Sequence, residues 1–93
     1  MARPTINQLR HLIRTLNYVV STHAAEELED DNLSILDLES IILTGQISER
    51  QRDPKTRESK IVISGVTLDG DQAQTVVKAG VTGKLIVITA YVL

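Results

Sequence analysis

The sequence contains no cysteine, no phenylalanine and no tryptophan. The absence of cysteine excludes a disulfide framework, a thiolate metal site and a cysteine nucleophile. Since the only aromatic rings belong to two tyrosines, the core must consist mainly of leucine, isoleucine, valine and alanine. No stretch approaches the roughly 20 apolar residues that span a membrane, and the first residues lack the apolar core of a signal peptide. We therefore expect a cytoplasmic protein that makes no contact with a membrane.

The net charge of −2 conceals a segregation of charge along the 93 residues. Residues 1–25 carry three basic side chains and no acid, whereas residues 26–39 carry seven acids and no base. Residues 40–60 are basic again, with five cations against three acids. Such runs usually form solvated faces, but a basic run can also present a local surface to a polyanion.

The apolar residues of the first half recur at helical spacing. Helices are predicted over residues 5–17, from Ser21 or Thr22 to the acidic run at 30–32, and from Ser34 to Leu43. Residues 18–20 are predicted to be a short extended link between the first two helices. Gly45 is expected to end the third helix in the left-handed conformation that glycine favours.

The second half changes to the alternating period of strands. Strands are predicted over residues 46–53, 60–68, 72–79 and 84–93, with a hairpin turn at Asp69-Gly70. The last of them is apolar on both faces, which is typical of a central strand. The fold class is therefore predicted to be α+β, with N-terminal helices packed on a twisted antiparallel sheet of three to four strands.

His23 is the strongest candidate for a catalytic residue. It lies in the first turn of a predicted helix, where free N–H groups disfavour added positive charge and favour a neutral imidazole that can act as a base. RNA cleavage by the 2′-oxygen needs such a base, an acid and positive charge near the phosphorus. Lys60, Tyr91 and an arginine at position 50 or 52 complete the predicted set, without metal or cofactor.

Each of these residues also has a purely structural interpretation. A histidine at a helix start often caps the helix or packs on a sheet edge. Lys60 and Tyr91 can simply belong to strands, and Glu26 and Glu27 can be surface carboxylates favoured by the helix dipole. Two histidines twelve residues apart, His11 and His23, are a weak metal signal.

The order and spacing of several short segments are shared with one bacterial family. These segments are Ser21-x-His23-Ala24, Leu33-Ser34, Ile42-Leu43-Thr44-Gly45-Gln46-Ile47, Ile61-Val62-Ile63-Ser64-Gly65, Asp69-Gly70, Val76-Val77 and Ile86-Val87-Ile88-Thr89-Ala90-Tyr91. On these residues the chain resembles the domain-of-unknown-function 4258 family over about 19–93. We predict one domain over 1–93, in which residues 1–17 form an extra N-terminal helix outside the family region.

That family is similar to small toxins of the RelE and MqsR kind, in which helices pack on a twisted antiparallel sheet. The resemblance implies a toxin with metal-independent endoribonuclease activity on messenger RNA, neutralised by a co-encoded antitoxin, which for MqsR-like members is a zinc-finger protein. His23 and Tyr91 match the family's expected catalytic positions. Lys60 is carried over as a third catalytic residue, and Arg50 and Arg52 are expected to bind RNA phosphates.

The sequence departs from the family pattern at three positions. Glu27 and Asp31 stand where members often carry arginine, and Gln74 stands where they often carry histidine. Acids beside the site would repel a phosphate by about 1 kcal/mol per charge at surface dielectric, unless the acidic helix faces away from it. The alternatives are a noncatalytic protein-binding module that kept the fold and a homodimer built through the edge of the sheet.

Overall fold

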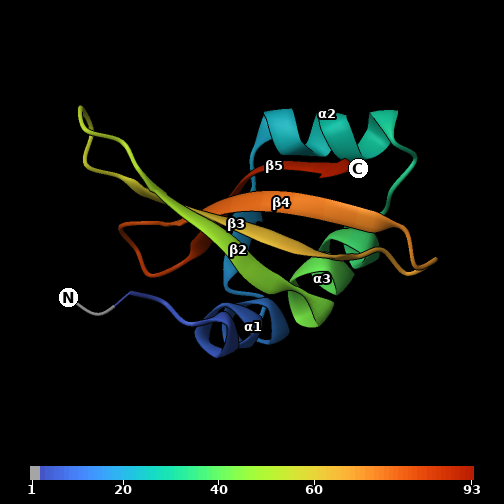
Figure 1. The fold of residues 1–93 in the computed structure, drawn as a ribbon, viewed down its shortest axis with the longest axis horizontal. Helices are drawn as coiled ribbons and strands as arrows, with labels where there is room; N and C mark the ends of the chain where they lie inside the picture. Colours follow the sequence, from blue (N-terminus) through green and yellow to red (C-terminus); the bar gives the residue numbers. More distant parts are fainter. Residues whose placement is uncertain (1–2) are drawn as a thin grey trace.

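The computed structural model describes residues 3–93, which form three helices and one sheet of five strands (Figure 1). Along the chain the elements are α1 (Ile6–Arg14), β1 (Tyr18–Val20), α2 (Thr22–Asp30), α3 (Ile35–Thr44), β2 (Gln46–Arg52), β3 (Ser59–Val66), β4 (Gln72–Ala79) and β5 (Leu85–Val92). The predicted α+β class is confirmed. The predicted count of three to four strands is wrong, because the sheet also includes β1.

The sheet has the strand order β1-β5-β4-β3-β2. Strands β2 to β5 form the predicted antiparallel meander, but β1 pairs in parallel with β5, which makes the sheet mixed. The pairing joins Tyr18 to Leu85 and Val20 to Val87. A three-residue strand has too little alternation to reveal itself, and its partner lies at the other end of the chain. β5 is an interior strand, as its two apolar faces indicate, although β4 occupies the middle of the sheet.

One face of the sheet carries the hydrophobic core. The residues of β4 alternate between buried and partly exposed positions, so only one of its faces is fully covered. The buried residues that pack together are Leu9, Ile13, Ala24, Leu28, Leu38, Ile42, Ile61, Ile63, Val77, Leu85, Val87 and Ala90. They come from all three helices and from β3, β4 and β5. The other face of the sheet carries every second side chain of β3 and β4, and we call it the open face. Its residues are Lys60, Val62, Ser64 and Val66 on β3 and Gln72, Gln74, Val76 and Lys78 on β4.

Gly45 and Gly65 allow α3 to lie close against β3. A Cβ atom at Gly65 would come within 2.1 Å of the Ile41 carbonyl oxygen, and one at Gly45 within 2.3 Å of the same oxygen. The prediction of a left-handed cap at Gly45 is wrong, since its φ of −88° is extended. The glycine is needed there for close packing and not for an unusual backbone conformation.

Local capping fixes the helix ends. Thr5 and Gln8 form the predicted capping box of α1, and Ser34 forms a second one with Asp37. The backbone N–H groups of Ser34 and Leu68 donate to the Asp37 carboxylate and hold its pKa below its ordinary value. The predicted end of α1 is three residues too late, because Leu16 adopts a left-handed φ of 59° and turns the chain toward β1.

Candidate functional site

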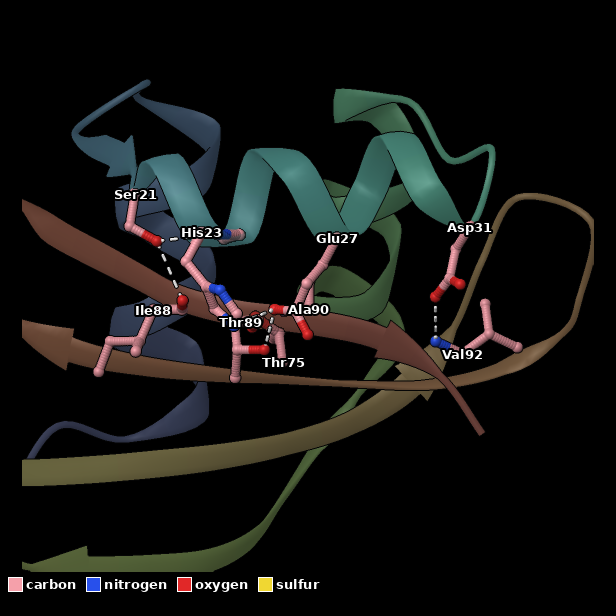
Figure 2. A network of polar contacts seen from close by, with 10 residues as sticks. Ser21, His23, Glu27, Asp31, Thr75, Ile88, Thr89, Ala90 and Val92 are labelled. Atoms are coloured by element: carbon pink, nitrogen blue, oxygen red, sulfur yellow. Dashed lines mark hydrogen bonds and ion pairs between the residues drawn. The ribbon is translucent and has the colours of Figure 1, made fainter.

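The structure divides the predicted site residues between two regions. His23 lies where α2 runs along β5 (Figure 2). Tyr91 lies on β5 itself. Arg50, Arg52 and Lys60 lie together in a groove at the β2–β3 end of the sheet.

Helix α2 closes the edge of β5 beyond the point where β1 ends. The hydroxyl of Ser21 donates to the carbonyl oxygen of Ile88 over 3.0 Å (Figure 2). The carboxylates of Glu27 and Asp31 accept the backbone N–H groups of Ala90 at 3.2 Å and Val92 at 3.1 Å. Side chains of a helix thus take the place of a neighbouring strand, and we call this contact the α2–β5 seam.

The spacing of the seam follows from the geometry of the two elements. Four helical residues rise by about 6 Å, and two strand residues advance by about 6.7 Å. Glu27 and Asp31 are therefore separated by nearly the same distance as the N–H groups of Ala90 and Val92. A β-bulge precedes them, because Val76 pairs with Thr89 and Val77 with Val87, which leaves the intervening residue of β5 unpaired with β4.

His23 joins this network through Glu27. Its Nε2 atom lies 3.3 Å from the Glu27 carboxylate, and its side chain is 69% exposed whereas that of Glu27 is 27% exposed. The same carboxylate accepts the hydroxyl of Thr89. A carboxylate at this distance can orient an imidazole that remains open to solvent, as the partner of a general base does. Glu26, by contrast, is exposed on the helix.

The open face carries a row of hydrogen-bonded polar side chains across four strands. The Tyr91 hydroxyl donates to Gln74 Oε1 at 2.8 Å, and Gln74 Nε2 donates to Ser64 Oγ at 2.9 Å. Ser64 Oγ in turn donates to Ser48 Oγ at 3.1 Å, and Ser48 donates to the Val62 carbonyl oxygen at 3.3 Å. We call this row the polar ladder, and the hydroxyl of Tyr91 is its first donor.

The groove at the β2–β3 end has a volume of about 520 Å³ and is strongly basic. Its cationic lining residues are Arg3, Arg50, Arg52, Arg57, Lys60 and Lys78. Among residues 3–93, Glu58 is the only acid that lines it, and it pairs with Lys78 at 3.2 Å. Arg50 is held by the carbonyl oxygen of Pro4, to which its guanidinium donates at 2.8 Å. We call this cavity the basic groove.

Asp53 shapes the hairpin that bounds the basic groove. Its carboxylate accepts the backbone N–H of Lys55 at 2.8 Å and that of Thr56 at 3.3 Å. These two hydrogen bonds hold the pKa of Asp53 below its ordinary value. The turn then brings Arg57, which has a left-handed φ of 59°, and Glu58 back toward β3.

The strand register relates the regions to one another. Lys60 pairs with Lys78, and four residues further along the same strands Ser64 pairs with Gln74. The basic groove and the polar ladder are therefore about 13 Å apart along the strands. Thr89, to which the seam is attached, lies between them in the row of Val76. His23 and Tyr91 thus share the β5 side of the open face, while the cations gather on its β2–β3 side.

Several of these residues escaped the sequence-based prediction. Lys78 and Arg57 line the basic groove, but nothing in their local pattern links them to Lys60. Glu27 and Asp31 do not face away from the sheet, and their signal was their spacing of four residues on one helix face. Within residues 3–93 no group of three or more histidine, aspartate or glutamate side chains is arranged to hold a metal ion. No helix in the described part of the chain combines the length and hydropathy needed to cross a bilayer.

Comparison with known proteins assigns the family. The pattern of the family described as "Domain of unknown function (DUF4258)" matches residues 20–92, and the chain belongs to this family. The match confirms the resemblance recognised in the sequence, and it begins after α1. No curated protein and no solved structure matches the chain.

Proposed function

We propose that this protein binds RNA through the basic groove and belongs, with RelE-like and MqsR-like proteins, to the endoribonuclease toxins. The observation that supports this most is the gathering of Arg50, Arg52 and Lys60 with three further cations around one groove. Phosphate contacts supply most of the sequence-independent affinity for a nucleic acid. These arginine and lysine side chains come from three strands, a hairpin and residue 3, and they offer such contacts to several successive phosphates of one RNA strand.

The proposed cleavage needs no metal and takes place on the β5 side of the open face. The oriented imidazole of His23 takes the proton from a 2′-hydroxyl, whose oxygen attacks the adjacent phosphorus. The phosphodiester bond to the 5′-oxygen breaks, and Tyr91 gives its hydroxyl proton to that leaving oxygen. Lys60 lies in the basic groove on the β2–β3 side, where it binds a neighbouring phosphate of the same RNA. RNA that starts in the basic groove must cross the open face to reach His23.

Binding is tested with a fluorescein-labelled 12-nucleotide RNA by fluorescence anisotropy over a range of salt concentrations. Lys60→Ala and Arg52→Ala should each weaken binding and lower the slope of log affinity against log salt by about one. Arg14→Ala is the matched control, because Arg14 is an exposed cation on α1 outside the basic groove. An equal loss of affinity in Arg14→Ala would refute the groove as the binding site.

Cleavage is tested by induced expression in a bacterial host and by incubation of purified protein with RNA in EDTA. Wild type should arrest growth and cut RNA, and His23→Ala should do neither while remaining folded, since the side chain is 69% exposed. Cutting by His23→Ala at the wild-type rate would remove His23 from the mechanism.

A noncatalytic binding module is the second candidate function. The separation of His23 from the cations favours this candidate, because His23 lies beside β5 and the cations gather near β2, at the opposite edge of the sheet. In that case the basic groove would hold an acidic segment of a co-encoded antitoxin, as expected for a cytoplasmic toxin-derived protein. RNA binding without cleavage by wild type would favour this candidate over the enzyme.

A further inference from the structure

The polar ladder has a single hydrogen-bond direction. Its first donor is the hydroxyl of Tyr91 and its last acceptor is the backbone carbonyl of Val62. In between, Gln74 accepts at Oε1 from Tyr91 and donates from Nε2 to Ser64. The backbone end of the ladder cannot donate from its oxygen, so the direction cannot reverse without breaking the contact between Ser48 and Val62. The amide of Gln74 is therefore fixed in one of its two possible orientations.

This arrangement leaves half of the hydrogen-bonding capacity of Gln74 free. An amide has two N–H donors and two acceptor lone pairs, and the ladder uses one of each. Tyr91 and Ser64 stand on the neighbouring strands and approach the amide from its two sides. The remaining N–H and lone pair are available on a side chain that is partly exposed on the open face. They form a donor and an acceptor side by side.

We propose that Gln74 reads a base of the bound RNA and favours adenine. A fixed glutamine amide matches the N6 donor and N7 acceptor of adenine with two hydrogen bonds, and unpaired bases of single-stranded RNA are open to such contacts. Val76, in the adjacent row, is partly exposed and offers an apolar surface on which the base can rest. Tyr91 acts as a positioning residue for this contact, through its hold on the amide.

The inference rests on the proposed RNA binding and adds specificity to it. The polar ladder lies about 13 Å from Lys60 along β3, so one oligonucleotide can contact both regions. The phosphates then bind in the basic groove, and a neighbouring base reaches Gln74. Affinity and base preference thereby depend on different residues, which makes the two parts separable by experiment.

The test compares fluorescein-labelled A12, U12 and C12 oligoribonucleotides by fluorescence anisotropy at one salt concentration. Wild type should bind A12 about tenfold more tightly than U12 or C12, the discrimination expected of one bidentate contact. Gln74→Glu keeps the acceptor but loses the donor, so it should lose the preference for A12 and bind C12 best, since a carboxylate accepts from cytosine N4. Circular dichroism verifies that the variant is folded.

Two further variants isolate the role of the amide. Tyr91→Phe keeps the ring but frees the amide to turn, so the ratio of the affinities for A12 and U12 should fall toward one. Gln51→Glu is the matched control, because it makes the same change of charge on the exposed strand β2, where Gln51 lines the basic groove. It should lower the affinity for all three RNAs by one common factor.

The possible results separate the two proposals. Equal binding of A12, U12 and C12 by wild type would overturn base reading by Gln74 and leave RNA binding standing. A changed order of preference in Gln51→Glu, as large as that in Gln74→Glu, would also overturn it. If wild type binds none of the three RNAs, the proposed function fails together with the inference.

Discussion

The two edges of the sheet differ in how their unpaired backbone groups are protected. On one side, β5 is covered first by the three residues of β1 and then by the side chains of α2. On the other side, β2 is left exposed, with charged residues at Glu49, Arg50 and Arg52. One edge is closed by carboxylates that accept backbone N–H groups, and the other is protected by charges that discourage another strand.

This difference explains the acids that looked incompatible with a phosphate site. Glu27 and Asp31 lie on the helix of the predicted catalytic histidine, and each accepts a backbone N–H group of β5. Their presence follows from the open edge of β5 and not from a ligand. The cations that a phosphate requires are gathered at the opposite edge of the sheet, where Glu58, an acid that lines the groove, is paired with Lys78.

The largest effect is expected from removing Glu27. Glu27→Ala leaves the N–H of Ala90, a fully buried residue, without an acceptor, and it also removes the partner of Thr89. The free energy of unfolding should fall by about 2–3 kcal/mol, measured by urea denaturation. Glu26→Ala, at the exposed neighbouring position, should change it by less than about 0.5 kcal/mol. Equal stability of the two variants would contradict the role of the seam.

A smaller loss is expected at the far end of the same seam. Asp31→Ala removes the acceptor of the Val92 N–H, but Asp31 is exposed and water can replace the carboxylate. We expect a loss of about 1 kcal/mol in urea denaturation, with Asp30→Ala as the neutral control. A loss as large as that of Glu27→Ala would mean that the seam acts as one unit.

Tyr18, on β1, makes the stability of the folded protein depend on pH in the alkaline range. Burial and the hydrogen bond to Glu39, at 2.6 Å, raise the pKa of Tyr18 from its ordinary 10.0 to about 12. The folded state therefore holds this proton more tightly, so its stabilising effect is complete below pH 10 and is lost as the pH rises toward 12. Tyr18→Phe should remove this part of the alkaline slope of stability. An unchanged slope between pH 10 and 12 would contradict the assignment.

The smallest effect on stability is expected at the exposed edge. Replacing Glu49 and Arg52 by threonine should leave the free energy of unfolding nearly unchanged but remove the charges that oppose strand pairing. We expect concentration-dependent self-association in analytical ultracentrifugation. Arg14→Thr with Glu29→Thr makes the same change on two helices and should not associate. A variant of β2 that stays as dispersed as this control would show that edge charge is not what protects the strand.

Local patterns predicted most of the fold. The capping residues Thr5 and Ser34 located two helix starts, and alternation located the strands that form the meander. β1 was missed because its three residues become a strand only by pairing with Leu85 to Val87, which lie at the other end of the sequence. The role of Gly45 was predicted wrongly because a glycine is needed there for close packing against β3, which is distant in the sequence.

The candidate site was harder to predict from the sequence, because it too depends on contacts between residues that are distant in the sequence. Lys60 and Arg52 could be proposed from charge alone, since both lie in one basic run. Their neighbour Lys78 comes from a different strand, and only the register of β3 on β4 brings it alongside. Likewise the sequence spacing of Ser48, Ser64 and Gln74 does not reveal that they are bonded, because the polar ladder runs across the strands and not along them.

The contact between the first and the fourth quarter of the chain has a consequence for the order of folding. Ser21 and Ile88, which are bonded in the seam, are 67 residues apart, whereas β2, β3 and β4 meet through short hairpins. Closing the long loop costs chain entropy that the hairpins do not have to overcome. We expect the meander to form early and α2 to dock last. A partly folded chain would then already gather the cations of β2 and β3 while His23 still lacks its place beside Thr89.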